Sequence, residues 1–322
     1  LSRWNSGTMP GSTRQGARWR RFSTVPLKEC SQESDAMKAS QRRELERTAL
    51  EVRKDIVRMT GVSRACHLDS SLSVVDILVY LYWKVLKIRP DEPLWPERDR
   101  LVFSKDHGSP ALYAVLARRG FFERKELWNY RRLGAMLQGR PEHARTPGVD
   151  APGGSRGMAI GIANGLLLSS RMDGNDRRVF CVIGSEELRE GSLWESALRA
   201  GDLGFEGLTV VVDSSAPPSA AQTLAPGKEA SERKRFEAFG WRVMEADGHN
   251  FDHLERAVLR AHPGPEGLPS VIMARTIIGK GVSSAEKGPL EKPGRPLDRN
   301  GMEQALRELE LASDEIEGGV KP

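Results

Sequence analysis

The sequence contains little cysteine and no long hydrophobic run, and both shortages restrict the class of protein. Three cysteines occur among 322 residues, Cys30, Cys66 and Cys181, without the spacing of a metal or redox site. Such sparse cysteine is typical of a reducing compartment, and Cys181, inside an apolar segment, is expected in the core. No apolar run approaches the roughly 20 residues of a membrane span. We therefore expect a soluble globular protein of the cytoplasm.

Acidic residues are absent from residues 1–28, which hold six of the 49 basic residues. The rest of the chain has 43 basic against 44 acidic residues, so the basic pI of about 9.2 comes from this end. A balanced remainder gives no basic surface of the kind that binds nucleic acid. Residues 1–36 are predicted to be a disordered basic tail. Their Arg- and Ser-rich composition also fits a mitochondrial presequence, whereas the initial Leu and the helical pattern from Met37 favour a natural start at Met37.

Apolar strands and amphipathic helices alternate through the remainder of the chain. Strands are expected at residues 100–103, 179–183, 208–212, 241–244 and 270–274, and helices at 45–59, 74–85, 109 onward, 159–170, 192–203 and 251–261. This alternation predicts an α/β fold, a doubly wound parallel sheet flanked by helices, with ligands at the carboxyl ends of the strands. We assign residues 37–290 to this domain. Residues 291–322 are predicted to be a C-terminal extension with one short helix near 302–311.

Ser73 precedes an unusually apolar helix that includes Ile77, Leu78 and Leu81. Its side chain is expected to cap this helix, with Asp76 in the place of the acid of a capping box. A helix that is apolar on every side is buried or lies at a subunit contact.

The most informative segment runs from Val179 to Gly191. An apolar strand leads into Gly184 and a turn, a helix follows, and a second strand ends in Asp213-Ser214-Ser215. This unit resembles the thiamine diphosphate motif of the transketolases, which reads Gly-Asp-Gly and, after a similar gap, Asn-Asn. Further segments resemble the family in the same order along the chain: residues 95–113, 138–139, 146–150, 191–195, 247–250 and 278–282. The resemblance covers about residues 40–290 and implies the thiamine diphosphate-binding fold.

The resemblance also implies a function and a partner. A complete transketolase adds a pyrimidine-binding domain and a C-terminal domain, so this chain is similar to the N-terminal subunit of a split enzyme. Such a protein transfers a two-carbon ketol unit between sugar phosphates with thiamine diphosphate and Mg²⁺, in a homodimer or heterotetramer with a pyrimidine-domain subunit. The alternatives are a non-catalytic scaffold or regulatory subunit, and a changed site for another anion built on Arg140, Arg156 and His107.

The metal ligands of the family are replaced in this sequence. Ser185 and Ser215 stand where the family has the Asp and Asn that hold Mg²⁺, and Glu186 replaces the second Gly. Neutral hydroxyls are weaker ligands for Mg²⁺ than a carboxylate. Glu186 and Glu187 are expected to be solvated acids at a helix start, favoured by the helix dipole. The sequence therefore predicts that metal-dependent cofactor binding is lost.

Several other residues correspond to the cofactor site of the family. Gly154, Ser155, Arg156 and Gly157 match the segment in which a Leu, at the position of Arg156, packs on the thiazolium ring. A cation there repels the cofactor unless the Arg156 side chain turns outward to a surface acid. Gly184 and Glu187 belong to the same expected cofactor-binding set.

Two histidines and a glutamate are the expected catalytic residues. His67 and His107 match family histidines that face the diphosphate and the sugar, and His107 begins a helix, where anions bind. Arg140 occupies the position of a third family histidine, with His143 nearby as a partial substitute. Glu190 and Glu195 match family carboxylates at the dimer interface. The alternative is that both acids lie on an exposed helix face.

Overall fold

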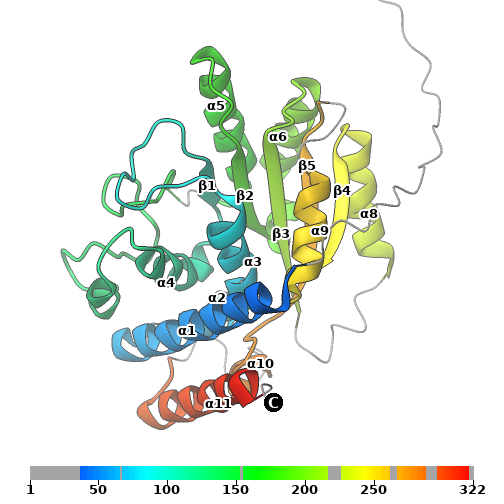
Figure 1. Ribbon diagram of the computed structural model, residues 1–322. Coiled ribbons are helices and arrows are strands. Elements are labelled where there is room, and N and C mark those ends of the chain that lie inside the picture. Colours follow the sequence, from blue (N-terminus) through cyan, green and yellow to red (C-terminus); the bar gives the residue numbers. More distant parts are fainter. Residues whose placement is uncertain are drawn as a thin grey trace, which may run out of the picture. The chain divides into compact units, whose positions relative to one another are not determined.

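The computed structural model describes residues 37–65, 67–152, 155–216, 226–261, 267–287 and 296–318; the side chains of 226–230 are not described. The predicted tail of residues 1–36, Cys66 and Gly154 lie outside this part of the chain. Five parallel strands form one sheet in the order β1-β2-β3-β5-β4 (Figure 1). Their bounds are Arg100–Phe103 (β1), Val179–Gly184 (β2), Leu208–Ala216 (β3), Arg242–Asp247 (β4) and Ser270–Ile277 (β5). The predicted doubly wound α/β fold is confirmed.

Helices cover both faces of the sheet, which is why its strands are apolar on both sides. One face carries α1 (Ala39–Ser63), α3 (Val75–Tyr80), α4 (Ser109–Arg119) and α9 (Phe251–Ala261), and the other carries α5 (Ala159–Met172), α6 (Gly191–Asp202) and α8 (Pro226–Ala238). Phe180 and Val182 of β2 pack on the α1/α3 side, and Cys181 and Ile183 on the α5/α6 side. Cys181 is fully buried, as predicted.

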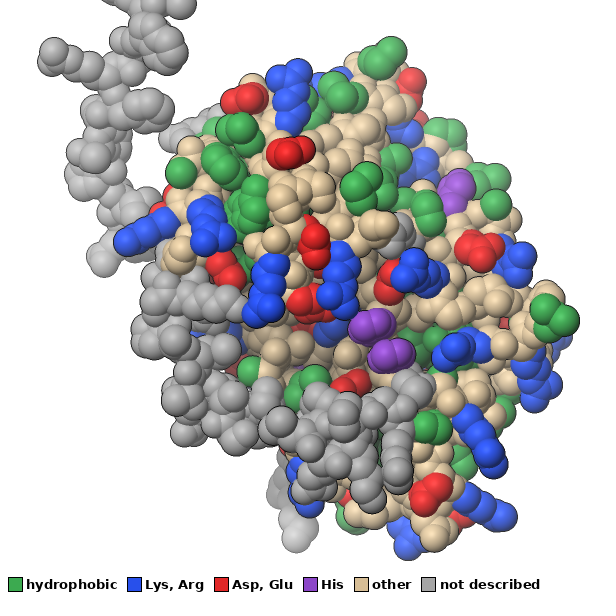
Figure 2. Space-filling view, turned by 180° about the vertical axis from the view of Figure 1, so that it is seen from behind, with side chains coloured by type: hydrophobic (Ala, Val, Ile, Leu, Met, Phe, Trp, Pro, Cys, Tyr) green, Lys and Arg blue, Asp and Glu red, His purple; other side chains and the backbone are tan. Residues whose placement is uncertain are grey.

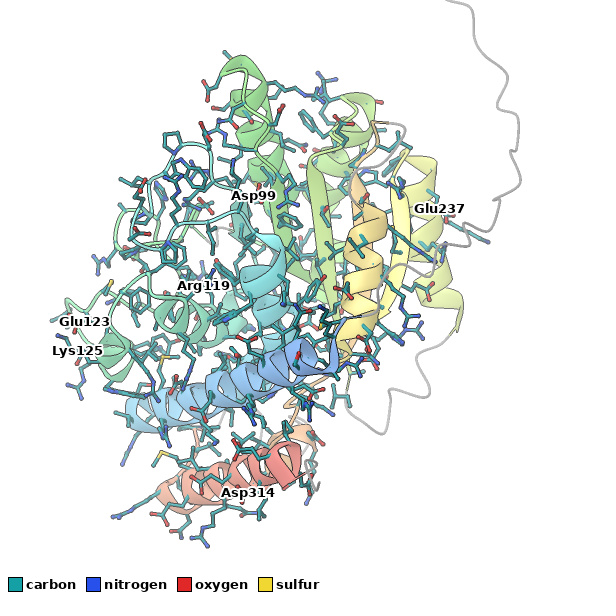
Figure 3. All side chains as sticks on the ribbon, viewed as in Figure 1. Asp99, Arg119, Glu123, Lys125, Glu237 and Asp314 are labelled. Atoms are coloured by element: carbon teal, nitrogen blue, oxygen red, sulfur yellow. The ribbon has the colours of Figure 1, made fainter. Side chains whose placement is uncertain are left out.

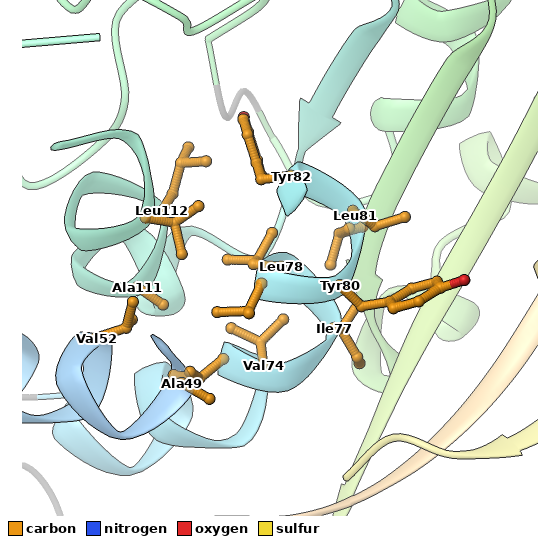
Figure 4. Packing of buried hydrophobic residues seen from close by; sticks show 14 of the residues in the cluster. Ala49, Val52, Val74, Ile77, Leu78, Tyr80, Leu81, Tyr82, Ala111 and Leu112 are labelled. Atoms are coloured by element: carbon orange, nitrogen blue, oxygen red, sulfur yellow. The ribbon is translucent and has the colours of Figure 1, made fainter. Parts of the chain in front are cut away.

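The first of these layers is held together by interlocking aliphatic side chains (Figure 4). Figure 4 shows Val52 of α1 beside Ala111 of α4, and Leu78 of α3 lies between this pair and Ile77. A chain of apolar contacts of this kind leaves α3 buried on every side, as its sequence predicts.

The segment before α3 differs from the prediction. Ser73 ends a separate helix α2 (Leu68–Ser73), α3 follows, and a π turn (Leu81–Val85) completes the segment. Neither Ser73 nor Asp76 makes a capping hydrogen bond. Asp76 instead accepts two hydrogen bonds from Arg53 of α1, at 3.0 and 2.6 Å. The predicted capping box is therefore wrong, because a buried arginine 23 residues earlier takes the carboxylate.

The last helix is longer than predicted. α11 spans Arg299–Gly318 and packs along α1 through Ala305 and Leu309, which are buried in the α1/α3 layer (Figure 1). Asp314, labelled in Figure 3, is exposed on this helix. The remaining short elements are 3-10 turns at Asp106–Gly108, Arg124–Asn129 and Ser185–Arg189 (η4) and the helix α10 (Ser283–Glu286). None of the described helices is long and apolar enough to cross a membrane.

Parallel strands bring their carboxyl ends to one edge of the sheet. Lys105 follows β1, Ser185 follows β2, Ser215 lies near the end of β3 and Thr276 near the end of β5. At the opposite edge, Asp99 (Figure 3) accepts hydrogen bonds from the backbone of Lys87 and Arg178. Polar residues, among them the predicted metal positions Ser185 and Ser215, therefore gather at the carboxyl edge.

Candidate cofactor site

A buried ion pair joins three strand ends at the carboxyl edge. The ammonium group of Lys105 contacts the carboxylate of Asp213 and lies 2.8 Å from the Ser73 hydroxyl, which donates to Asp213 at 2.9 Å. Thr276 of β5 donates to the other carboxylate oxygen of Asp213. Asp213 has no exposed surface and Lys105 only 4%. Removing one partner from such a pair leaves an uncompensated buried charge, so this network fixes the strand ends relative to α2.

Glu187 forms a second buried centre on the other face of the same edge. Its carboxylate accepts hydrogen bonds from the Ser104 hydroxyl at 2.6 Å, the Gly184 amide at 3.0 Å and the Gly157 amide at 3.1 Å. Glu187 is 2% exposed, so the prediction of a solvated acid is wrong for this residue. Burial raises the pKa of Glu187 although these three donors lower it, and the charge of Glu186 adds to the rise.

The contacts of Glu187 tie the turn before α5 to the end of β2. Gly157 has a left-handed backbone (φ 81°), and a Cβ placed on it would lie 2.6 Å from Cβ of Glu190 and 2.8 Å from the Ser192 hydroxyl. Glycine is therefore required for this close approach. The neighbouring Ser155 and Arg156 are exposed. In this turn, Gly157 is therefore packed against Glu190 and Ser192, while Ser155 and Arg156 are exposed to solvent.

The two predicted histidines meet at the surface of this edge. The rings of His67 and His107 are parallel, with centroids 4.2 Å apart, and two neighbouring histidines are visible on the face shown in Figure 2. The buried Ser71 hydroxyl reaches both backbone carbonyls, that of His67 at 2.9 Å and that of His107 at 3.3 Å. Burial lowers the pKa of His67, and His107 and Arg131 lower it further while Asp69 opposes them. This environment favours the neutral imidazole.

Asp106 directly precedes His107 in the chain and interacts with Arg140 and Arg156. One carboxylate oxygen lies 3.2 Å from Arg140, and the other is buried without a hydrogen-bond partner among the described residues. Burial raises the pKa of Asp106, while the charges of Arg140 and Arg156 lower it. The guanidinium of Arg140 is therefore engaged beside His107, whereas His143 is turned to its own loop, with Nδ1 2.6 Å from the Val149 carbonyl oxygen.

The family's metal positions lie on the same edge without a dedicated carboxylate. Ser185 and Ser215 are both half-exposed. No group of three or more His, Cys, Asp and Glu side chains within the described ranges is arranged to hold a metal ion. Glu186 is exposed, as predicted, but its carboxylate folds back to within 2.7–2.8 Å of the point where a Cβ of Gly184 would lie. The residues present therefore fit Mg²⁺ only with Glu186 as the carboxylate ligand, because two hydroxyls carry no charge to offset the ion.

The expected interface acids lie at the start of α6. Glu190 directly precedes the helix and is half-buried, and Glu195 is exposed one turn further on. Neither makes an ion pair with another described residue. Neither carboxylate is therefore engaged by a basic side chain in the described part of the chain.

A cavity of about 600 Å³ lies beside the site, at the ends of β4 and β5. Thr276 lines it and joins it to Asp213, and His249 lines it from the loop after β4. His249 accepts a hydrogen bond from the Ile277 amide at 2.8 Å and donates to Asp76 at 2.6 Å. Although burial would raise the pKa of Asp76, Arg53 and His249 hold it well below its usual range. This buried link fixes the loop that follows β5.

Sequence reasoning missed several residues that build the site. They are Ser71, Ser73, Ser104, Lys105, Asp213 and Thr276. Ser104, Lys105 and Asp213 lie in segments that resemble the family, and the others are polar residues in or near the ends of apolar elements at the carboxyl edge.

Comparison with known proteins places these features in a family. The family model described as the transketolase thiamine diphosphate-binding domain matches residues 49–316. The chain is 36% identical over 272 residues to the 6-deoxy-6-sulfo-D-fructose transketolase subunit of a Clostridium species, covering 84% of this chain and 98% of that protein. It is 32% identical over 274 residues to one of the subunits of the apulose-4-phosphate transketolase of Actinobacillus succinogenes, covering 85% of this chain and 96% of that protein.

Single-chain transketolases match over the same region. Human transketolase is 31% identical over 266 residues, which are 82% of this chain but 42% of that protein. The crystal structure of the Campylobacter jejuni transketolase superposes with a TM-score of 0.72 at 28% identity, covering 85% of this chain and 43% of that one. The chain thus spans less than half of these enzymes and nearly all of the two separate subunits. It belongs to the family of the thiamine diphosphate-binding, N-terminal domain of the transketolases.

Proposed function

We propose that this chain is the N-terminal subunit of a two-subunit transketolase. Together with a pyrimidine-domain subunit, it transfers a two-carbon ketol unit between sugar phosphates and binds thiamine diphosphate. The observation that carries this proposal is the buried Glu187, which ties the Gly157 turn to the end of β2 at the carboxyl edge of the sheet, the edge that also presents the stacked pair His67 and His107. The comparisons give the non-catalytic alternative no support.

Each group at the edge has a role that follows from its contacts. When bound, thiamine diphosphate supplies the carbanion that carries the ketol unit. Glu187 holds the backbone turns at Gly157 and Gly184 in place, and these two turns would form part of the surface that holds the cofactor. His67, neutral because its pKa is lowered, accepts a hydrogen bond from a substrate hydroxyl or takes its proton. Arg140 and Arg156, both exposed, attract the anionic sugar to this face.

The partner completes the site from outside this chain. His67 and His107 are both exposed at the carboxyl edge, so a second subunit placed there would exclude water from them. We propose that Glu190 and Glu195 lie at the subunit contact of a homodimer or heterotetramer. Glu190 packs against Gly157 at the start of α6 and has no basic partner among the described residues, so its carboxylate is available for a subunit contact.

The test uses the chain by itself, the isolated pyrimidine-domain partner, and the two together. Ketol transfer is measured with a ketose phosphate donor and an aldose phosphate acceptor. We expect activity only for the mixture, and its loss in His107→Ala with the assembly intact by analytical ultracentrifugation. Full activity of the isolated chain would contradict the proposal, as would an assembled complex that neither binds the cofactor nor transfers a ketol unit.

A further inference from the structure

We infer that Glu186 is the carboxylate that holds a divalent cation at this edge, in place of the acid missing at Ser185. The inference rests on the proposed function, because it concerns the same cofactor site. The proposed ligands are the Glu186 carboxylate, the Ser215 hydroxyl and the diphosphate oxygens. Glu186 follows Ser185 in the chain, and its side chain folds back toward Gly184.

The strand register defines the face on which the metal would lie. Gly184 of β2 is paired with Asp213 of β3, so side chains at these two positions point to the same side of the sheet. That side carries Phe180, Val182 and Val211, which pack in the α1/α3 layer. Ser215, two residues beyond Asp213, lies on this same side at the very end of the strand.

The Glu186 carboxylate lies on this side as well. Its two oxygens come within 2.7 and 2.8 Å of the Cβ position of Gly184, and that position points to the Asp213 side. Glu187, the next residue, reaches the opposite side, where Ser104 and Gly157 hold it. The two acids of the turn therefore diverge. The Glu187 side chain is held in the protein interior, whereas the Glu186 carboxylate lies over the end of β2.

The charges around Glu186 favour a cation. No basic side chain of the described residues pairs with it, whereas the adjacent Asp213 is neutralised by Lys105. Mg²⁺ commonly binds through one or two protein carboxylates, phosphate oxygens and water. One carboxylate and the Ser215 hydroxyl, with the diphosphate, would meet that requirement.

Gly184 has a specific part in this arrangement. The three atoms nearest to a Cβ at this position all belong to the Glu186 carboxyl group. The backbone of Gly184 is an ordinary extended one (φ −86°, ψ 152°), so alanine fits it. Gly184→Ala therefore displaces the Glu186 carboxylate without removing it.

The test measures Mn²⁺ binding by electron paramagnetic resonance, on the full chain assembled with its partner, with and without thiamine diphosphate. We expect cofactor-dependent Mn²⁺ binding by the unmodified complex. Glu186→Gln and Gly184→Ala should each weaken it at least tenfold, the lower end of what loss of a ligand-supporting group costs. Glu206→Gln, an exposed acid before β3 at the opposite edge, is the matched control and should leave the affinity unchanged. A double change, Ser185→Asp with Glu186→Gly, should restore binding.

Unchanged Mn²⁺ affinity in Glu186→Gln would overturn the inference. A complex that binds no Mn²⁺ would overturn it as well. In that case, calorimetric titration with thiamine diphosphate shows whether the proposed function fails together with the metal site. Cofactor binding that needs no metal leaves the proposed function standing. No cofactor binding removes both.

Discussion

Glu186 and Glu187 are neighbours in the sequence, yet their surroundings are opposite. Glu187 is buried, accepts three hydrogen bonds and joins two glycine turns, whereas Glu186 is exposed and has no basic partner in the described structure. The difference separates two tasks within one short turn. The frame that shapes the cofactor site is fixed by buried hydrogen bonds, and the groups that would touch the metal are side chains free to change. A sequence can therefore replace the family's ligands while the frame persists.

The largest expected effect is on the buried frame. Asp213→Ala should lower the free energy of unfolding by about 3–5 kcal/mol, because it leaves the Lys105 ammonium buried without its counter-charge. Asp314→Ala, on the exposed surface of α11, should change it by less than about 0.5 kcal/mol. Urea denaturation followed by circular dichroism measures both. Equal stability of the two variants would show that the strand-end network does not hold the edge together.

The next effect compares the two acids directly. Glu187→Ala should cost about 2–3 kcal/mol, since it leaves two backbone amides and the Ser104 hydroxyl unpaired in the interior. Glu186→Ala should cost less than about 0.5 kcal/mol. The same denaturation experiment measures them. A stability loss in Glu186→Ala as large as that in Glu187→Ala would remove the distinction between frame and ligand.

A smaller effect sharpens the comparison at the surface. His67 has a left-handed backbone (φ 77°, ψ 26°), which is unfavourable for residues with a Cβ. His67→Gly should therefore be more stable than His67→Ala by about 1 kcal/mol, although both lose the imidazole and both should lose activity. Thermal unfolding of the two variants measures the difference. If alanine proves as stable as glycine, the backbone at this position stores no strain.

The smallest effect is a pH dependence. The pKa of Glu187 in the folded chain is raised above its ordinary value of 4.5, so the folded state holds this proton to a higher pH than the unfolded state. Its contribution to the free energy of unfolding therefore falls as the pH rises from about 4.5 through the raised pKa. Glu187→Gln lacks this titration. The free energy of unfolding of the unmodified protein should therefore fall relative to that of Glu187→Gln as the pH rises, and only across that window. A difference that stays constant with pH would mean that Glu187 does not titrate on folding.

The sequence predicts the fold well because the fold depends on local patterns. The apolar runs at 100–103 and 179–183 become β1 and β2, and the helix predicted at 251–261 is α9. His67 and His107 were also predictable as a pair, since both match family histidines of the site, and the structure brings their rings together.

The missed parts depend on contacts between distant residues. Ser73 and Asp76 have the spacing of a capping box, but Asp213 and Arg53, far away in the chain, take their side chains. The burial of Glu187 depends on the direction of one 3-10 turn, which the sequence does not specify. The predicted loss of metal binding, drawn from Ser185 and Ser215, stays a prediction, and the position of Glu186 supports the opposite proposal.

The most direct test of the account is a calorimetric titration of thiamine diphosphate into the complex of this chain with its pyrimidine-domain partner. The account predicts saturable binding at one site per chain in the presence of Mg²⁺, weakened by a metal chelator and by Glu186→Gln. A folded, assembled complex that gives no heat of binding at any Mg²⁺ concentration would contradict it.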